Sequence, residues 1–196
     1  MLWSTPDSCA RVAAEIGKDS LSIIEVQPIE RLRELAERAK SLRADFQPAQ
    51  IAQGGKCSDI RGDLTRWLEF EDPLETQLLG SLTELRTALN RQLLLGLNEI
   101  EGHYSLYPKG AHYKRHLDRP RGNDRRALSM VLYLNADWRD EWGGELVLFT
   151  VAGERSVSPR LGTVVLFLSD VLEHEVRPSS VDRLGAAFWF LRGQRL

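Results

Sequence analysis

Cysteine is scarce in this 196-residue sequence, and long apolar runs are missing. The two cysteines, Cys9 and Cys57, are too few for a disulfide framework and are not spaced as C-x-x-C, so we expect free thiols that bind no metal. Apolar runs such as Val164 to Leu168 are far too short to span a bilayer, and the N-terminus lacks a basic segment followed by an apolar one. These absences predict a cytoplasmic protein without a membrane partner.

A strong charge of either sign is also absent. The formal net charge is -2 and the pI is near 6.1, so nothing attracts the chain generally to phosphate backbones or anionic lipids. We therefore expect no nucleic-acid partner. Hydrophobic residues make up 42% of the chain and charged residues 28%, which are ordinary values for a folded protein of one domain.

Two amphipathic helices are predicted in the first half of the chain. The stretch Pro28 to Ala44 places its apolar residues at three- and four-residue spacings behind an N-terminal proline, and Leu74 to Leu95 repeats the spacing with leucines. Between them lies Gln47 to Leu68, in which Gly54-Gly55 favours a mobile loop that leads into a strand through Trp67.

From about Glu99 the pattern changes to short β-branched and aromatic runs separated by turn residues. The candidate strands are Ile100–Tyr107, His112–Asp118, Leu128–Leu134, Glu145–Phe149, Thr163–Leu168, His174–Arg177 and Gly185–Arg192. Seven short strands without intervening helices predict an antiparallel sandwich or jelly roll rather than a parallel sheet. We expect an α+β, mainly β fold. In it, residues 1–98 form a helical support that carries the loop, and residues 99–196 form the β core of the same domain.

A candidate metal site follows from three side chains. His116 and Asp118 lie two apart in one predicted strand, so their side chains point to the same side, and His174 lies in another predicted strand. Two histidines and one carboxylate form the facial triad of non-haem iron, which leaves three coordination positions open. An H-x-D pair alone is also typical of an exposed turn.

Arg183 strengthens the interpretation as an iron site. It comes nine residues after His174 and just before the apolar strand that begins at Gly185. A guanidinium that faces into a barrel is costly unless it meets a carboxylate, and the distal carboxylate of a 2-oxo diacid fits that need.

The remaining histidines are His103 and His112. His112 has the same strand parity as His116 and resembles a ligand for that reason. Because imidazole rings are often partly buried without a special role, we expect both to be packed or sheet-surface residues. Neither belongs to the predicted site.

Several further motifs occur in a fixed order. They are Asp59-Ile-Arg-Gly-Asp63 with Trp67, Tyr107-Pro108, Tyr113-Lys-Arg-His-Leu-Asp118, Tyr133-Leu-Asn135, Gly143-Gly144, His174-Glu-Val and Arg183 through Trp189. With these motifs, the span from about Cys57 to Leu191 resembles the prolyl hydroxylases among the Fe(II)- and 2-oxoglutarate-dependent oxygenases. The likeness is to the enzymes that hydroxylate hypoxia-inducible factor and to their bacterial relatives. It implies a double-stranded β-helix, a jelly-roll or cupin-like fold, with iron held by the predicted triad.

The resemblance also implies how 2-oxoglutarate is bound. The co-substrate would chelate iron through its 1-carboxylate and 2-oxo oxygens, while Arg183 and the Tyr133 hydroxyl would hold its 5-carboxylate. Tyr107 would line the pocket near the chelating end, and Trp189 would form pocket wall. One departure is Ala187, where animal relatives carry a hydroxyl side chain, and it leaves the reactivity toward dioxygen open.

On the substrate side, the resemblance implies a closing loop and strand. Arg61, Asp63 and Trp67 would close over a protein substrate, with Arg126 reaching it from the opposite side. The alternative interpretation of these residues is a surface ion pair and a core tryptophan.

The function predicted in this way is that of a dioxygenase using Fe(II), 2-oxoglutarate and O2 to hydroxylate a prolyl residue in a protein, giving succinate and CO2. A translation factor or a ribosomal protein is a candidate substrate by resemblance, and oxygen sensing is a candidate role.

Two alternatives stay open. A nucleic-acid demethylase of the same superfamily would use the same triad, but such enzymes carry a second arginine where this chain has Trp189, and the mild acidity also counts against it. A non-catalytic metal-binding cupin module would need neither Arg183 nor Tyr133.

Overall fold

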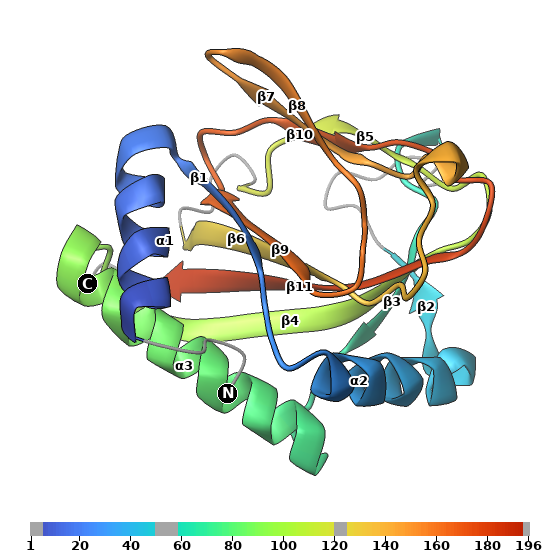
Figure 1. The fold of residues 1–196 in the computed structure, drawn as a ribbon, viewed down its shortest axis with the longest axis horizontal. Helices are drawn as coiled ribbons and strands as arrows, with labels where there is room; N and C mark the ends of the chain where they lie inside the picture. Colours follow the sequence, from blue (N-terminus) through green and yellow to red (C-terminus); the bar gives the residue numbers. More distant parts are fainter. Residues whose placement is uncertain (1–5, 50–58, 120–124, 194–196) are drawn as a thin grey trace.

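The computed structural model describes residues 6–49, 59–119 and 125–193. Residues 50–58, which include Cys57 and the Gly54-Gly55 part of the predicted loop, lie outside the described residues. The chain folds into two antiparallel sheets with helices against the larger one (Figure 1).

The helices are α1 (Pro6–Asp19), α2 (Ile29–Ser41) and α3 (Pro73–Leu93), with short 3-10 helices η1 (Arg43–Asp45) and η3 (Asp140–Trp142). The large sheet has the order β1-β9-β6-β11-β4-β3-β2. Its strands are β1 (Leu21–Glu25), β9 (Thr163–Leu168), β6 (Arg126–Tyr133), β11 (Arg183–Arg192), β4 (Leu97–Tyr107), β3 (Leu64–Trp67) and β2 (Gln47–Pro48). The small sheet has the order β5-β10-β7-β8, made of β5 (Tyr113–His116), β10 (His174–Val176), β7 (Leu146–Thr150) and β8 (Gly153–Val157). This architecture confirms the predicted mainly β fold with supporting helices.

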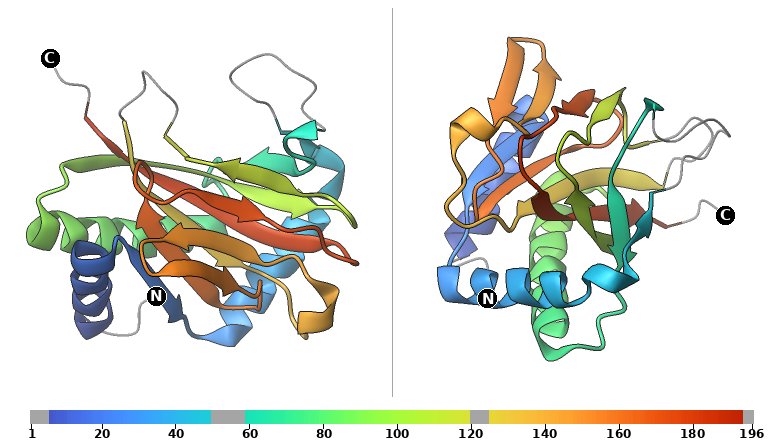
Figure 2. Two further views of the ribbon diagram at one scale, coloured as in Figure 1. Left: turned by 90° about the horizontal axis from the view of Figure 1, so that it is seen from above. Right: turned by 90° about the vertical axis from the view of Figure 1, so that its right-hand side faces the viewer.

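The large sheet has two different faces. Helices α2 and α3 lie on one side of it, and the small sheet with its β7–β8 hairpin lies on the other (Figures 1 and 2). Alternate residues of β11 reach the helix side, where they join the main core: Leu184, Ala186, Phe188 and Phe190. The residues between them, from Arg183 to Trp189, therefore face the small sheet.

Both predicted helices are confirmed with slightly different ends. Helix α3 begins after Asp72, whose carboxylate accepts a hydrogen bond from the Leu74 N–H, and it ends at Leu94 in the left-handed conformation. Helix α2 follows Pro28 and ends at Ser41, before η1. None of the described helices is long and apolar enough to cross a membrane.

Residues 6–25 belong to the core, although no element was predicted there. Helix α1 packs against α3, and β1 pairs with β9 as an edge of the large sheet, with Leu21 opposite Phe167. Together with β2 and β3, this strand brings the part of the chain before residue 98 into the same sheet as the part after it.

Besides β1 and β2, which were not predicted, two strands of the small sheet differ from the prediction. The predicted strand His112–Asp118 is shorter, because β5 ends at His116 and Asp118 follows it in a bend. Strand β8 was not predicted, since Gly153–Val157 is mostly polar and exposed at the edge of the small sheet.

The packing of Gly102 gives a testable expectation for stability. A Cβ on this β4 residue would lie 2.3 Å from the Phe188 ring and 2.9 Å from the Ala187 carbonyl oxygen. We expect Gly102→Ala to lower the free energy of unfolding by roughly 1–3 kcal/mol through overpacking, measured by urea titration. The matched control is Gly80→Ala on the exposed side of α3, which meets nothing within 4 Å and should raise it by about 0.5–1 kcal/mol. Wild-type stability of Gly102→Ala would contradict the described packing.

Candidate active site

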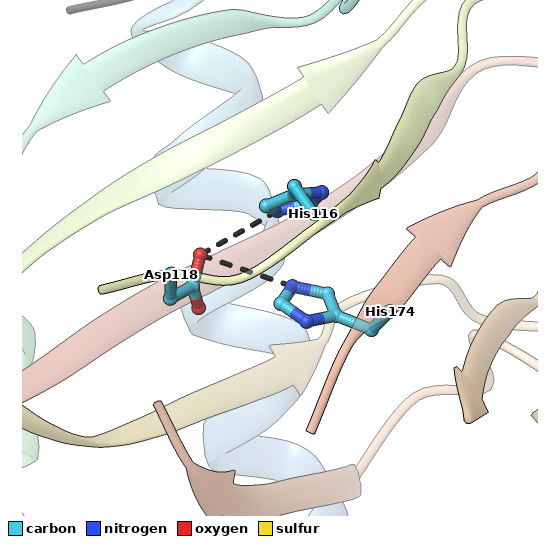
Figure 3. A group of neighbouring side chains, drawn as sticks. All are labelled: His116, Asp118 and His174. Carbon is cyan, nitrogen blue, oxygen red and sulfur yellow. Dashed lines mark ion pairs between the residues drawn. The ribbon is translucent and has the colours of Figure 1, made fainter. Parts of the chain in front are cut away.

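Two strands of the small sheet and the bend after β5 bring together a cluster of three potential ligands. His174 on β10 lies directly opposite His116 on β5. The Oδ1 atom of Asp118 is 3.5 Å from Nε2 of His116 and 3.8 Å from Nε2 of His174 (Figure 3). The three ligand atoms all lie within 4.8 Å of one another, an arrangement that one metal ion can bridge.

Both histidines are oriented by backbone carbonyl groups. Nδ1 of His116 is 2.7 Å from the carbonyl oxygen of Lys114, and Nδ1 of His174 is 3.2 Å from that of Leu172. Because a carbonyl oxygen can only accept, each Nδ1 carries a proton, and Nε2 is the ring nitrogen that faces Asp118. This is the tautomer that metal-binding histidines need.

The charge states also suit a divalent cation. Burial lowers the pKa of His174 to about 4, against the opposing effect of Asp118, so the ring is neutral at neutral pH. Burial raises the pKa of Asp118, but His174, His116 and the Ser129 hydroxyl more than offset this, and its pKa lies well below the usual range. Metal binding at neutral pH therefore displaces no proton from these two groups.

Arg183 carries a buried charge on the inner face of the large sheet. Its exposed fraction is 2%, and its guanidinium lies 4.9 Å from the ring centres of both Tyr107 and Tyr133. Among the described residues it has no ion-pair partner, because the adjacent Asp182 contacts Arg43 instead. Burying such a charge without a counter-charge is costly, so the structure favours an anion beside it.

Two unsatisfied polar atoms mark where that anion fits. Nε of Arg183 and the Tyr133 hydroxyl are both buried, and neither has a hydrogen-bond partner among the residues that the structure describes. Burial raises the pKa of Tyr133 more than Arg183 lowers it, so the hydroxyl stays a donor at neutral pH. A carboxylate between the two would accept from both, which matches the 2-oxoglutarate position implied by the sequence resemblance.

Small residues separate Arg183 from the region of the triad. Along the inner face of β11, Gly185 and Ala187 lie between Arg183 and Trp189, and Gly185 is paired with Tyr133. Asp118 reaches this wall near Trp189, because its partner Ser129 is the residue paired with Trp189. Small side chains therefore line the wall between the buried charge and the three potential ligands.

The predicted substrate loop contributes a buried ion pair rather than a surface one. Arg61 makes a bidentate contact with Asp63, at 2.7 and 2.6 Å, and the Asp63 side chain is 0% exposed. Burial alone would lower the pKa of Arg61, but the hydrogen bonds and the charge of Asp63 raise it by a larger amount. The guanidinium therefore stays charged. It lies 4.4 Å over the ring of Tyr113, which in turn stacks on His116 with ring centres 3.5 Å apart.

A second group of aromatic residues forms the other end of the wall. Trp67 is 49% exposed, so the alternative of a core tryptophan does not hold. Its ring lies 5.1 Å from His103 and 6.3 Å from Trp189, and the Arg126 guanidinium covers Trp189 at 3.8 Å while pairing with Glu101 at 2.8 Å. Trp67, Arg126 and Trp189 thus lie together, and the Arg61–Asp63 pair lies beside β5.

Three residues near the site had no predicted role: His103, Tyr113 and Ser129. His103 is a packed residue, as expected, but it sits between Trp67 and Trp189 on the inner face of β4. Strand parity could have indicated that His103 and Ser129 face the site. His103 is four residues from Tyr107 and Ser129 is four residues from Tyr133, so each lies on the same face of its strand as a predicted pocket residue. His112 contributes no ligand to the cluster.

A surface pocket of about 520 Å³ lies elsewhere, between the end of α2, η1 and the turn before β11. Trp138 and Trp142 line it together with the Arg43–Asp182 pair. It includes none of the three ligands and neither Arg183 nor Tyr133, so we place no metal or 2-oxoglutarate there.

Comparison with known proteins gives consistent matches. A family model described as the 2OG-Fe(II) oxygenase superfamily matches residues 102–191. A Pseudomonas putida prolyl-4-hydroxylase structure is similar at 37% sequence identity and a TM-score of 0.88, over 95% of this chain and 100% of that one. A prolyl hydroxylase from Trichoplax adhaerens, solved with a peptide fragment of the hypoxia-inducible factor oxygen degradation domain, matches at 22% identity and a TM-score of 0.83, over 93% and 88% of the two chains. A prolyl 4-hydroxylase from Phytophthora capsici matches at 24% identity and 0.76, over 95% and 63%. The last two likenesses concern the fold alone.

The ligand geometry predicts that His174→Ala loses tight iron binding. Removing one of three ligands leaves a bidentate site, so iron retained after anaerobic desalting should fall from about one per chain to near none. His112→Ala is the matched control, because His112 is half-buried in the segment before β5 and lies outside the cluster. Stoichiometric iron in the His174 variant, or equal loss in both variants, would remove His174 from the site.

The buried His103 predicts a defined pH dependence of stability. Burial lowers its pKa from 6.5 to about 4, so between these values the unfolded chain binds a proton that the folded chain does not. This group therefore makes the free energy of unfolding fall as the pH drops from 6.5 to 4, by up to about 1.4 kcal/mol per pH unit, and contributes no slope above that range. The free energy of unfolding of wild type and of His103→Gln can be measured by urea titration at several pH values between 4 and 6.5. It should change less with pH in the variant. Equal slopes would mean that His103 is not held neutral.

Proposed function

Since this chain belongs to the 2OG-Fe(II) oxygenase superfamily and is a prolyl-hydroxylase-type dioxygenase, we propose that it hydroxylates a prolyl residue in a protein substrate. Enzymes of this family require Fe(II), 2-oxoglutarate and O2. The observation that carries the proposal is the Arg183 charge, which has no ion-pair partner in the described part of the chain and is buried on the wall that faces the His116, Asp118 and His174 cluster.

Each group of residues has a separate task in this proposal. Iron bound with 2-oxoglutarate and O2 supplies the oxidation, in which 2-oxoglutarate is converted to succinate and CO2 and one oxygen atom enters a C–H bond. The two histidines and Asp118 would hold the iron. Arg183 and Tyr133 would hold the 5-carboxylate, a charge-assisted contact typically worth about 1.5–3 kcal/mol, and Tyr107 would line the same pocket.

The surface around the site supports a protein substrate. Ile60, Trp67, Leu117 and Val171 are large apolar side chains that are 38–53% exposed. Leu117 lies between two ligands, the Ile60 carbonyl accepts the Lys114 N–H of β5, and Val171 is in the turn before β10. Apolar groups gathered around a site favour docking of a macromolecule over capture of a free amino acid. Trp67 with Arg126, and the Arg61–Asp63 pair, would contact that protein.

A nucleic-acid substrate is less compatible with the charges at the same place. Arg61 is paired with Asp63, Arg126 with Glu101, and the exposed arginines beside the ligands are paired too: Arg115 with Glu173 and Arg119 with Asp170. A phosphate backbone would have to compete with a carboxylate for each of these four. The prolyl hydroxylase assignment therefore has the stronger support.

We further propose a cytoplasmic location, with an exposed loop of a translation factor or a ribosomal protein as the substrate. Oxygen sensing is a related proposal. It depends on the apparent O2 affinity, which the oxygen dependence of turnover measures. Ala187, half-buried on the inner wall between Val131 and His103, offers no hydroxyl group to the site.

The proposed function is tested by anaerobic titration of the protein with Fe(II) and 2-oxoglutarate, followed through the visible charge-transfer band. Exposure to air should then give succinate, and mass spectrometry of co-incubated cell extract should find a prolyl peptide heavier by one oxygen atom. We expect Arg183→Met, which keeps the side-chain volume but not the charge, to raise the 2-oxoglutarate requirement by roughly ten- to a hundredfold.

Three results would count against this function. No band in folded, iron-loaded protein would exclude chelation of 2-oxoglutarate. An unchanged requirement in Arg183→Met would mean that another cation anchors the diacid. Succinate formed without any modified protein, but with release of methyl groups from nucleic acid, would favour the demethylase.

A further inference from the structure

Regular pairing between β6 and β11 stops one residue short of Leu184, and beyond it the Leu134 N–H still donates to the Leu184 carbonyl at 3.2 Å. The pairing between these strands begins at Gly185 opposite Tyr133, so Arg183 and Leu184 extend beyond the regular ladder on that side. On the other side, Arg183 is paired with Tyr107 of β4. The residue with the buried charge therefore sits where β11 has a regular strand on one edge only.

The side chain of Asn135 forms hydrogen bonds with both backbone polar groups of Leu184. Its Oδ1 accepts from the Leu184 N–H at 2.7 Å, and its Nδ2 donates to the Leu184 carbonyl at 2.8 Å. The side-chain amide thus supplies the acceptor for the Leu184 N–H, and it adds a second donor to the Leu184 carbonyl, which also accepts from the Leu134 N–H. The second Nδ2 hydrogen goes to the Pro159 carbonyl at 2.8 Å, and the Asn135 backbone carbonyl accepts from Leu161.

No other side chain of the same size could make this set of contacts. Two of the partners are carbonyl oxygens and the third is an N–H, so the orientation of the amide is fixed by chemistry. An aspartate would keep the acceptor but lose both donors and place its charge against two carbonyl groups.

We propose that Asn135 is a positioning residue for 2-oxoglutarate. By bracketing Leu184 it holds Arg183 against Tyr133, so that the guanidinium and the hydroxyl converge on one carboxylate. This inference rests on the proposed function, because it takes Arg183 as the anchor of the diacid. Asn135 itself would touch neither iron nor 2-oxoglutarate.

The chain contains a matched control for this idea. Asn90, in the last turn of α3, brackets Leu97 in the same way, with its Oδ1 accepting from the N–H at 2.8 Å and its Nδ2 donating to the carbonyl at 2.7 Å. Leu97 is the first residue of β4, whereas Tyr107, the neighbour of Arg183, is the last. Asn90→Ala thus removes a comparable bracket far from the anchor.

The test is calorimetric titration of 2-oxoglutarate into Mn(II)-loaded wild type, Asn135→Ala, Asn135→Asp, Asn90→Ala and Arg183→Met, with thermal unfolding of each. We expect both Asn135 variants to bind 2-oxoglutarate about tenfold more weakly, and Asn90→Ala to lose thermal stability while keeping the wild-type Kd. In steady-state assays, Asn135→Ala should raise KM for 2-oxoglutarate with kcat at saturation nearly unchanged. The aspartate variant, equal in size, serves if the alanine variant does not fold.

The outcomes separate the inference from the function on which it rests. If Arg183→Met weakens binding and the Asn135 variants do not, the positioning role is wrong and the anchor stands. If Asn90→Ala weakens binding as much as Asn135→Ala, the effect is general loosening and the positioning role is wrong. If wild type binds no 2-oxoglutarate, or if Arg183→Met binds it as wild type does, the anchor assignment fails and the inference fails with it.

Discussion

The site depends on one constraint, a positive charge enclosed by walls that do not neutralise it. Arg183 is held between two tyrosine rings, and the neighbouring carboxylate of Asp182 is directed to Arg43 instead. The backbone approaches closely at Gly144, where a Cβ would lie 3.4 Å from Cδ of Arg183 and where φ is +75°. Within residues 6–49, 59–119 and 125–193, the protein thus encloses the side chain without supplying an anion. Burying such a charge without a partner lowers the free energy of unfolding of the ligand-free protein. A bound carboxylate removes this cost, and the affinity for it is correspondingly higher.

That cost is offset on the opposite face of the same strand. The helix-side residues of β11, such as Phe188 and Phe190, are fully buried in the main core with α2 and α3. Their inward-facing neighbours Gly185 and Ala187 are small and contribute little packing. Because side chains alternate along a strand, one sequence of ten residues can serve stability on one side and binding on the other. This division is consistent with the three unsatisfied buried polar atoms on the inner wall, which belong to Tyr133, Arg183 and Trp189.

The sequence predicted those parts of the molecule whose chemistry restricts the residue type. Strand and helix periods were sufficient to predict most of the strands after residue 97 and the helices α2 and α3, and an iron site needs histidine and carboxylate ligands. Other features arise only from the fold. The surroundings of His103 are made by Trp67 and Trp189 from two other strands, and Asn135 acts on a residue 49 positions later. Neither relation leaves a local pattern, because strand register and not spacing brings the partners together.

The candidate metal site and the proposed substrate side are joined by direct packing. The Tyr113 ring lies between the Arg61 guanidinium and the imidazole of His116, and Arg61 is fixed in turn by the buried carboxylate of Asp63. An isolated β-bridge between Arg61 and Tyr113 adds a backbone connection. His116 cannot tilt without moving this stack, because its other ring nitrogen is already bound to the Lys114 carbonyl. His116, a candidate metal ligand, and the residues proposed to meet the substrate therefore form one packed unit, so that ordering of the Arg61–Asp63 segment and orientation of the imidazole depend on the same contacts.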